Sequence, residues 1–182
     1  MARLFVAILP PATVRAELAA LAAPLPGMRR TPADSLHLTL RFIGDTDAPR
    51  QAAIEEALAV VRVEPFILPV AGLGLFPTRG PAKVLWAGLG RSHTRLYQLR
   101  KQVDEALLSV DMTLDVHSFH PHFTLGRPGG DVDPRLLAKF LERHAGFEAP
   151  PFRVGEFQLM SSELAAGAAP VYHTVRAFPL QR

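Results

Sequence analysis

The sequence predicts a two-lobed α/β (α+β) protein that forms one domain over residues 1–182. Segments with strand and helix patterns alternate along the chain. The order strand, helix, His-x-Thr strand, helix, strand occurs twice, and the two motif histidines, His37 and His122, lie 85 residues apart (122 − 37). A repeat of this length is too long for a solenoid and suits two related lobes.

The first half of the chain contains six predicted elements. The apolar run LFVAIL predicts a buried strand, and the two prolines after it end the strand and open a helix with helically spaced apolar residues. The alternating segment LHLTLRFI predicts a second strand, closed by Gly44 and Asp45. The six elements are a strand at residues 4–9, a helix at 12–21, a strand at 36–43, a helix at 49–61, a glycine-interrupted strand region at 66–76 and a strand at 83–89.

The second half repeats this order. Ser92 is a suitable N-cap for a helix to about residue 110, and Asp133 with Pro134 opens a later helix. The predicted elements are a helix at residues 92–110, a strand at 119–125, a helix at 133–144 and strands at 152–160 and 171–180. We expect lobes of about residues 1–82 and 83–182, and an exchange of terminal strands between them is left open.

Composition limits the classes of function. Cysteine is absent, which excludes disulfides, thiolate nucleophiles and thiolate metal ligands. The net charge is +3, carried almost entirely by arginine, which suits phosphate but is also common in proteins of GC-rich genomes. No apolar run approaches the roughly 18 residues that cross a bilayer, and the N-terminal run is too short for a signal peptide. We therefore expect a cytoplasmic monomer without a membrane partner or a cofactor.

Two His-x-Thr motifs carry the candidate chemistry. In a strand, His37 and Thr39 share one face while the leucines between and beside them share the other, and the same holds for His122 and Thr124. Each lobe would then bury its apolar residues and present an imidazole and a hydroxyl to a common cleft.

A pair of imidazoles suits the opening of a cyclic phosphodiester. That reaction needs a base for the attacking water and an acid for the departing ribose oxygen, on opposite sides of phosphorus. Histidine titrates near neutrality and fills either role. Two hydroxyl donors can stabilise the non-bridging oxygens. A single His-x-Thr tripeptide on a strand is common, so the residues alone leave both a catalytic and a structural role open.

Five sequence blocks resemble the two-histidine phosphoesterase superfamily, specifically the LigT-like RNA 2′,3′-cyclic phosphodiesterases. The resemblance covers essentially the whole chain, and the extended FHPHFTLGR block is more specific to this branch than the paired His-x-Thr motif. The blocks are RLFVAILP near the N-terminus, LHLTLRFIGD at 36–45, LWAGL at 85–89, FHPHFTLGR at 119–127 and VYHTVRAFPL at 171–180.

The resemblance implies two antiparallel sheets that face each other across a cleft, with the helices outside. It implies metal-independent hydrolysis of an RNA 2′,3′-cyclic phosphate to a 2′-phosphate, and members can also join tRNA halves through a 2′,5′ linkage without ATP. By motif position it makes His37 and His122 the catalytic pair and Thr39 and Thr124 phosphate-binding residues. We assign His37 as the acid and His122 as the base, although the sequence does not fix which is which.

Further residues beside the motifs are candidates for substrate contacts. Arg127 lies where the family motif places an arginine, and a bulge at Gly126 would turn it towards the catalytic face, which strict alternation does not. Alternation places Arg41 on the catalytic face, where it would add phosphate affinity. The remaining candidates are Phe42 and Phe119 for base stacking and His120 for lining the cleft or supporting a catalytic residue.

Three alternatives remain open. His117, His120 and His122 could bind a metal, although Asp115 is the nearest carboxylate and no second ligand cluster is evident. The substrate could be a small cyclic nucleotide, because the modest charge does not require a long RNA contact surface. The chain could also bind RNA ends without turnover, against which both complete motifs argue.

Overall fold

The computed structural model describes residues 1–91, 93–113, 115, 118–130, 132–163 and 170–182, and its mixture of helices and antiparallel strands confirms the predicted fold class. The elements in chain order are β1 (Ala2–Ile8), α1 (Ala12–Leu21), β2 (Met28–Arg30), a 3₁₀ turn (Ala33–Ser35), β3 (Leu38–Thr46), α2 (Ala48–Leu58), β4 (Phe66–Ala71), β5 (Leu73–Phe76), β6 (Val84–Ala87), α3 (Thr94–Leu108), β7 (Phe123–Pro128), α4 (Pro134–Arg143), β8 (Glu148–Val154), β9 (Glu156–Glu163) and β10 (Val171–Pro179).

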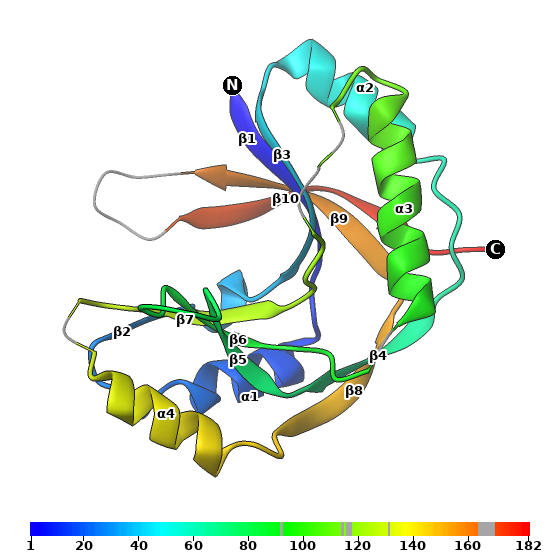
Figure 1. The fold of residues 1–182 in the computed structure, drawn as a ribbon. Coiled ribbons are helices and arrows are strands. Elements are labelled where there is room, and N and C mark those ends of the chain that lie inside the picture. Colours follow the sequence, from blue (N-terminus) through cyan, green and yellow to red (C-terminus); the bar gives the residue numbers. More distant parts are fainter. Residues whose placement is uncertain (92, 114, 116–117, 131, 164–169) are drawn as a thin grey trace.

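The strands form an eight-stranded sheet and a two-stranded sheet. The large sheet has the order β10-β9-β1-β3-β7-β6-β5, with β2 also paired to β7, and the small sheet pairs β4 with β8. The central strands β3 and β7 pair through Leu38 opposite Phe123. Each of these residues directly follows a motif histidine. The large sheet therefore consists of two four-stranded lobes that meet where the two motifs begin (Figure 1).

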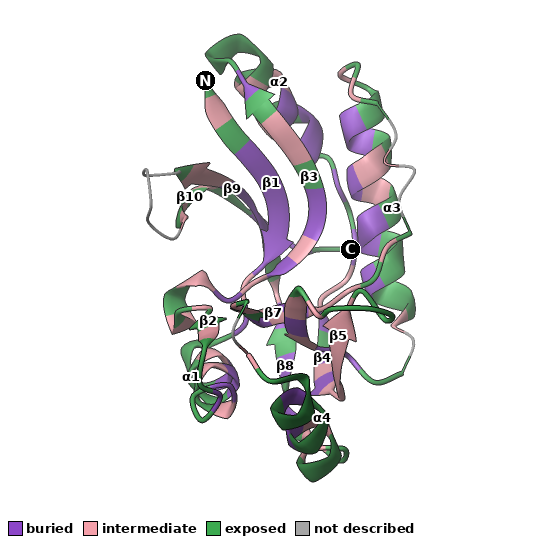
Figure 2. Ribbon diagram, turned by 60° about the vertical axis from the view of Figure 1, so that its left-hand side comes forward, coloured by how far each residue is buried: buried purple, intermediate pink, exposed green. Residues whose placement is uncertain are grey.

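Helices pack beside both lobes and leave the other face of the central strands for the site. α3 packs against α2 and β3, whereas α1 packs against β8 (Figure 1). In β1, Leu4, Val6 and Ile8 belong to the main core, and Phe5 and Ala7 belong to a separate small cluster. Strand alternation thus gives β1 two buried faces, visible as a continuous buried stretch in Figure 2.

Several strand limits differ from the prediction for local reasons. β3 begins at Leu38 rather than residue 36, after the 3₁₀ turn, and β7 begins at Phe123 rather than residue 119. Pro121 lacks the amide hydrogen that an extended ladder would use. The predicted strands at 66–76 and 152–160 are each two strands, divided at Gly72, where φ is 78°, and at Gly155.

The helix predictions agree closely with the structure. The predicted helix at 12–21 is α1, and Asp133 caps α4 by accepting a hydrogen bond from the Arg135 amide at 2.8 Å. Ser92 lies outside the described residues, and the N-cap position of α3 is His93. β2 was not predicted, because its sequence Met-Arg-Arg carries no strand pattern.

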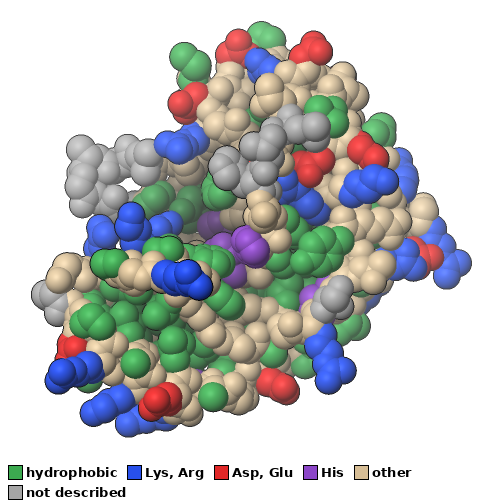
Figure 3. Space-filling view, in the orientation of Figure 1, with side chains coloured by type: hydrophobic (Ala, Val, Ile, Leu, Met, Phe, Trp, Pro, Cys, Tyr) green, Lys and Arg blue, Asp and Glu red, His purple; other side chains and the backbone are tan. Residues whose placement is uncertain are grey.

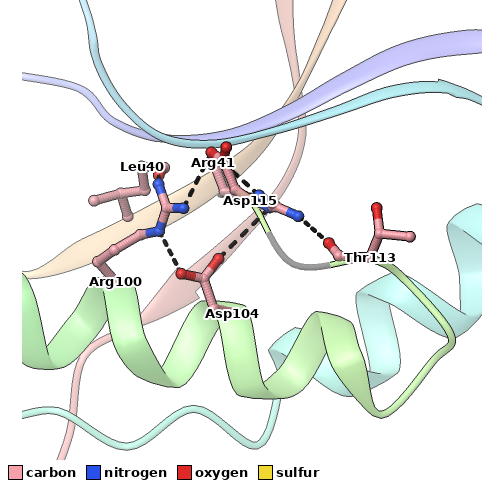
Figure 4. Close-up of polar contacts among 6 residues, drawn as sticks. All are labelled: Leu40, Arg41, Arg100, Asp104, Thr113 and Asp115. Carbon is pink, nitrogen blue, oxygen red and sulfur yellow. Dashed lines mark hydrogen bonds and ion pairs between the residues drawn. The ribbon is translucent and has the colours of Figure 1, made fainter. Parts of the chain in front are cut away.

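Two arginines and two aspartates form an ion-pair cluster between β3, α3 and the segment after it (Figure 4). Arg41 lies 3.5 Å from Asp104 and 3.1 Å from Asp115. Arg100 lies 2.6 Å from Asp104 and 3.2 Å from Asp115. Arg100 also donates to the Leu40 carbonyl, and Arg41 donates to the backbone carbonyl at residue 113. The cluster therefore links β3, which carries the first motif, to the segment between α3 and β7, which leads to the second motif.

The D104N substitution is expected to lower the free energy of unfolding by about 1–3 kcal/mol, because it leaves two largely buried guanidinium groups with one carboxylate. The side chain of Asp104 is 22% exposed, which keeps the loss below that of a fully buried pair. Urea unfolding followed by circular dichroism measures it. The control is E105Q, whose partner Lys101 is exposed and whose loss should not exceed about 0.5 kcal/mol. Equal losses in both variants would contradict the stabilising role of the cluster.

Candidate active site

The two motif histidines are held in the same way. His37 lies one residue before β3, and His122 lies one residue before β7. Nδ1 of His37 is 2.8 Å from the Ser35 carbonyl oxygen, and Nδ1 of His122 is 2.7 Å from the His120 carbonyl oxygen. A carbonyl oxygen only accepts, so each Nδ1 carries a proton and donates it. Nε2 of each ring is therefore the atom left for proton transfer.

Burial lowers the pKa of both imidazoles below the ordinary value of 6.5. For His37, the bond to the Ser35 carbonyl raises the pKa and the charge of His122 lowers it. For His122, the bond to the His120 carbonyl raises the pKa, and the charges of His120 and Arg127 lower it. Both rings are therefore mainly neutral at neutral pH, and each motif lies within electrostatic reach of the other.

Aromatic rings flank both imidazoles. The rings beside His37 come from β1 and β10, and those beside His122 come from β5 and β6. They exclude water from one side of each imidazole and restrict its plane. The ring-centroid distances are 4.9 Å from His37 to Phe5, 5.0 Å from His37 to Tyr172, 5.1 Å from His122 to Phe76 and 6.4 Å from His122 to Trp86.

The two threonines have equivalent surroundings. Thr39 is half-buried between the buried Leu38 and Leu40, and Thr124 is half-buried between a buried phenylalanine and a buried leucine. Each hydroxyl therefore stands on the strand face opposite the main core, two residues after a motif histidine.

A bulge follows the motif threonine in both lobes. The pairing of β1 with β3 shifts so that Leu40 has no partner, and the pairing of β6 with β7 shifts so that Leu125 has none. The bulge reverses the alternation for the residues that directly follow it. In β3 a second register shift leaves Ile43 without a partner. Phe42 and Arg127 are equivalent positions after the bulge, and both are exposed.

The prediction that Arg41 lies on the catalytic face assumed strict alternation along the strand. The bulge at Leu40 breaks that alternation, so the prediction was wrong. Arg41 is 6% exposed, and its guanidinium contacts Asp104 and Asp115. Burial lowers its pKa, while the charge of Asp104 raises it and that of Arg100 lowers it. Strict alternation placed Arg127 away from the catalytic face. In the structure it lies close enough to His122 for its charge to lower the pKa of that imidazole. A phosphate contact by either arginine stays a prediction.

Two cavities meet at the second motif. The smaller has a volume of about 670 Å³ and is lined by Thr39, Arg41, Phe42 and Phe119 among others. The larger has a volume of about 880 Å³ and extends from Trp86 towards α3. Figure 3 shows histidine side chains in the hollow of this face, with hydrophobic side chains around them. The residues common to both cavities are Phe76, His120 and His122.

Comparison with known proteins assigns the family. The model of the family described as LigT like Phosphoesterase matches residues 8–86 and 89–170. This chain belongs to the LigT-like phosphoesterases. The match confirms the resemblance and the enzyme class that the sequence motifs predicted.

Sequence relatives with one common name and a solved structure with the same fold are similar to this chain. An Aeropyrum pernix protein named RNA 2′,3′-cyclic phosphodiesterase is 34% identical over 81% of this chain and 84% of its own length. An Archaeoglobus fulgidus protein of the same name is 30% identical over 97% of this chain and 99% of its own. The crystal structure of Escherichia coli LigT complexed with 3′-AMP covers 100% of this chain and 99% of its own, with 26% identity and a TM-score of 0.79.

The remaining predicted residues of this LigT-like phosphoesterase lie around the two cavities. Phe42 is 69% exposed, with its ring centroid 6.2 Å from that of Phe5. Phe119 packs against Tyr97 at 5.7 Å and lies 5.1 Å from the Arg100 guanidinium carbon. His120 is exposed and lies 6.1 Å from Phe76 between ring centroids.

The sequence did not indicate the rings that flank the two motif imidazoles. Phe5, Phe76 and Tyr172 look like ordinary strand aromatics, which usually belong to a core. Trp86 carried a detectable signal, because it is the one tryptophan of the chain.

The metal alternative combined His120 and His122 with His117, which lies outside the described residues. Within the described ranges, no group of three or more His, Asp or Glu side chains is arranged to hold a metal ion. In the same part of the chain, no helix has both the length and the apolar character that a membrane span requires.

Proposed function

We propose that this LigT-like phosphoesterase opens the 2′,3′-cyclic phosphate at an RNA end to a 2′-phosphate, with His37 and His122 as an acid–base pair. The observation that carries the proposal is the duplicated arrangement: each imidazole donates from Nδ1 to a carbonyl two residues earlier, and each has a threonine two residues later. The related proteins named RNA 2′,3′-cyclic phosphodiesterase support RNA as the substrate.

The proposed reaction moves two protons. Nε2 of His122 accepts a proton from water as the water oxygen bonds to phosphorus. The bond from phosphorus to O3′ breaks, and protonated His37 gives its proton to O3′. The product is a 2′-phosphate with a free 3′-hydroxyl. Thr39 and Thr124 donate to the non-bridging oxygens, and Arg127 adds positive charge nearby. The charge of Arg41 is balanced by Asp104 and Asp115, so its contribution is smaller.

The same geometry supports a ligation. When a 5′-hydroxyl of a second RNA replaces water, attack at phosphorus with loss of O3′ forms a 2′,5′ linkage without ATP. His122 accepts the proton of that hydroxyl, and His37 again protonates O3′. The two halves of a cleaved tRNA are substrates of the required kind.

Turnover in excess EDTA tests the proposed mechanism. RNA ending in a 2′,3′-cyclic phosphate should be converted to a 2′-phosphate, assigned by phosphorus NMR, at the same rate with and without EDTA. Activity that disappears with EDTA and returns with a divalent ion would replace the two-histidine mechanism with a metal-assisted one. No conversion in either condition would leave RNA-end binding without turnover or a different substrate.

The pH dependence of kcat/KM should be bell-shaped with its maximum below pH 6.5. Catalysis needs one protonated and one neutral imidazole, and this state is most populated between two pKa values that burial places below 6.5. The rate falls at higher pH as the acid loses its proton. The kcat profile should extend to higher pH, because the bound phosphate anion favours the imidazolium. A kcat/KM maximum above 6.5 would contradict the assignment of two buried histidines as the titrating pair.

A further inference from the structure

The larger cavity is lined by residues that have no role in the proposed reaction at phosphorus, among them Trp86, Arg91 and Tyr97. It is continuous with the catalytic site, because His122 and Phe76 line it as well as the smaller cavity. From there it extends past Trp86 to Arg91 and to Tyr97 on α3. Its volume of about 880 Å³ is within the range of small-molecule sites.

Trp86 forms a flat platform in this cavity. It pairs across strands with Gly74, and a Cβ at that glycine would lie 2.1 Å from the indole. A Cβ at Gly88 would lie 3.0 Å from the other edge of the ring. The indole therefore lies across two glycines, and a side chain at position 74 would displace it. Phe76 packs against both the indole and His122, with its centroid 5.1 Å from that of Trp86 at an interplanar angle of 31° and 5.1 Å from that of His122.

The polar groups of the cavity suit a polyanion with aromatic bases. The indole Nε1 of Trp86 is buried and has no hydrogen-bond partner among the described residues, so this residue offers a ligand its ring rather than a donor. Arg91 is exposed at the rim, and none of the described lining residues is acidic. Aromatic rings beside arginine are the usual means of holding single-stranded nucleic acid, because every base presents a face that can stack.

We propose that this cavity binds the nucleoside that precedes the terminal one, with its base on Trp86. The proposal rests on the proposed function and specifies the substrate as an RNA of two or more nucleotides. The smaller cavity contains residues of both motifs, Thr39 and His122, so the terminal nucleoside, whose ribose carries the cyclic phosphate, belongs there. The larger cavity contains only the second motif and takes the next nucleoside along the strand.

Kinetics with substrates of two lengths test the proposal. The kcat/KM for a dinucleotide ending in a 2′,3′-cyclic phosphate should exceed that for the mononucleotide by about 10- to 100-fold, the effect expected from stacking one base. Trp86→Leu and Arg91→Ala should each reduce this ratio, and Trp86→Phe should keep part of it. The ratio is the readout because damage to His122 or to folding would lower both rates together. Arg135→Ala removes an exposed arginine on α4 and should leave the ratio unchanged.

The single tryptophan gives a second readout that needs no turnover. Fluorescence of the unmodified protein should be quenched by a dinucleotide ending in a 2′-phosphate much more strongly than by adenosine 2′-phosphate. Equal quenching by both probes would place the terminal base on Trp86 and overturn the proposal. Turnover without a length preference and without quenching would also overturn it while leaving the proposed function intact. Selective quenching without turnover of any cyclic phosphate would support the subsite and reject the proposed function.

Discussion

The H122A substitution is expected to lower kcat by about 10²–10⁴-fold, the contribution of a positioned acid or base. H37A should have an effect of similar size. In the proposed mechanism the two imidazoles act in one transition state, so the double variant should lose much less than the product of the two single losses. Initial rates on an RNA 2′,3′-cyclic phosphate measure all three variants.

The matched control for both histidine variants is H144A. His144 makes the same kind of contact, with Nδ1 2.8 Å from the Phe140 carbonyl oxygen, but it lies at the end of α4 and belongs to neither His-x-Thr motif. Its removal should leave kcat unchanged within error. Thermal unfolding of each variant separates lost catalysis from lost structure. Full activity in both H37A and H122A would rule out the two-histidine mechanism.

The repeated motif made much of this site predictable. Histidine and threonine two residues apart in a strand lie on one face for geometric reasons, so the sequence could indicate which side chains face the cleft. The repeated element order brought the two motifs to a common cleft, and the family resemblance then added the roles of the histidines and threonines. Helix limits also followed from local chemistry, since Asp133 and the proline after it form a cap that needs no tertiary contact.

Non-local pairing limited what could be predicted. Alternation placed Arg41 on the catalytic face, but the bulge at Leu40 depends on how β1 pairs with β3, and strand pairing is not encoded within either segment. The ion pairs of Arg41 likewise come from α3 and the segment after it, more than 60 residues away. For the same reason the glycines beneath Trp86 could not be recognised, because Gly74 meets the indole only after β5 pairs with β6.

The T39V and T124V substitutions are expected to lower kcat by about 10- to 1000-fold each, because a hydroxyl aimed at a phosphate oxygen is worth most when charge redistributes in the transition state. Valine keeps the branched shape that packs between the buried neighbours of each threonine, so the change tests the hydroxyl rather than the packing.

Serine at the same positions is the decisive comparison. T39S and T124S keep the donor and should recover most of the rate, whereas a purely structural role for the γ-methyl group would give the opposite order. Because the proposal places the two repeated motifs around one phosphate, the two valine variants should have losses of similar size. A loss confined to one threonine would show that a single lobe binds the phosphate, and the symmetric assignment of the two hydroxyls would then be wrong.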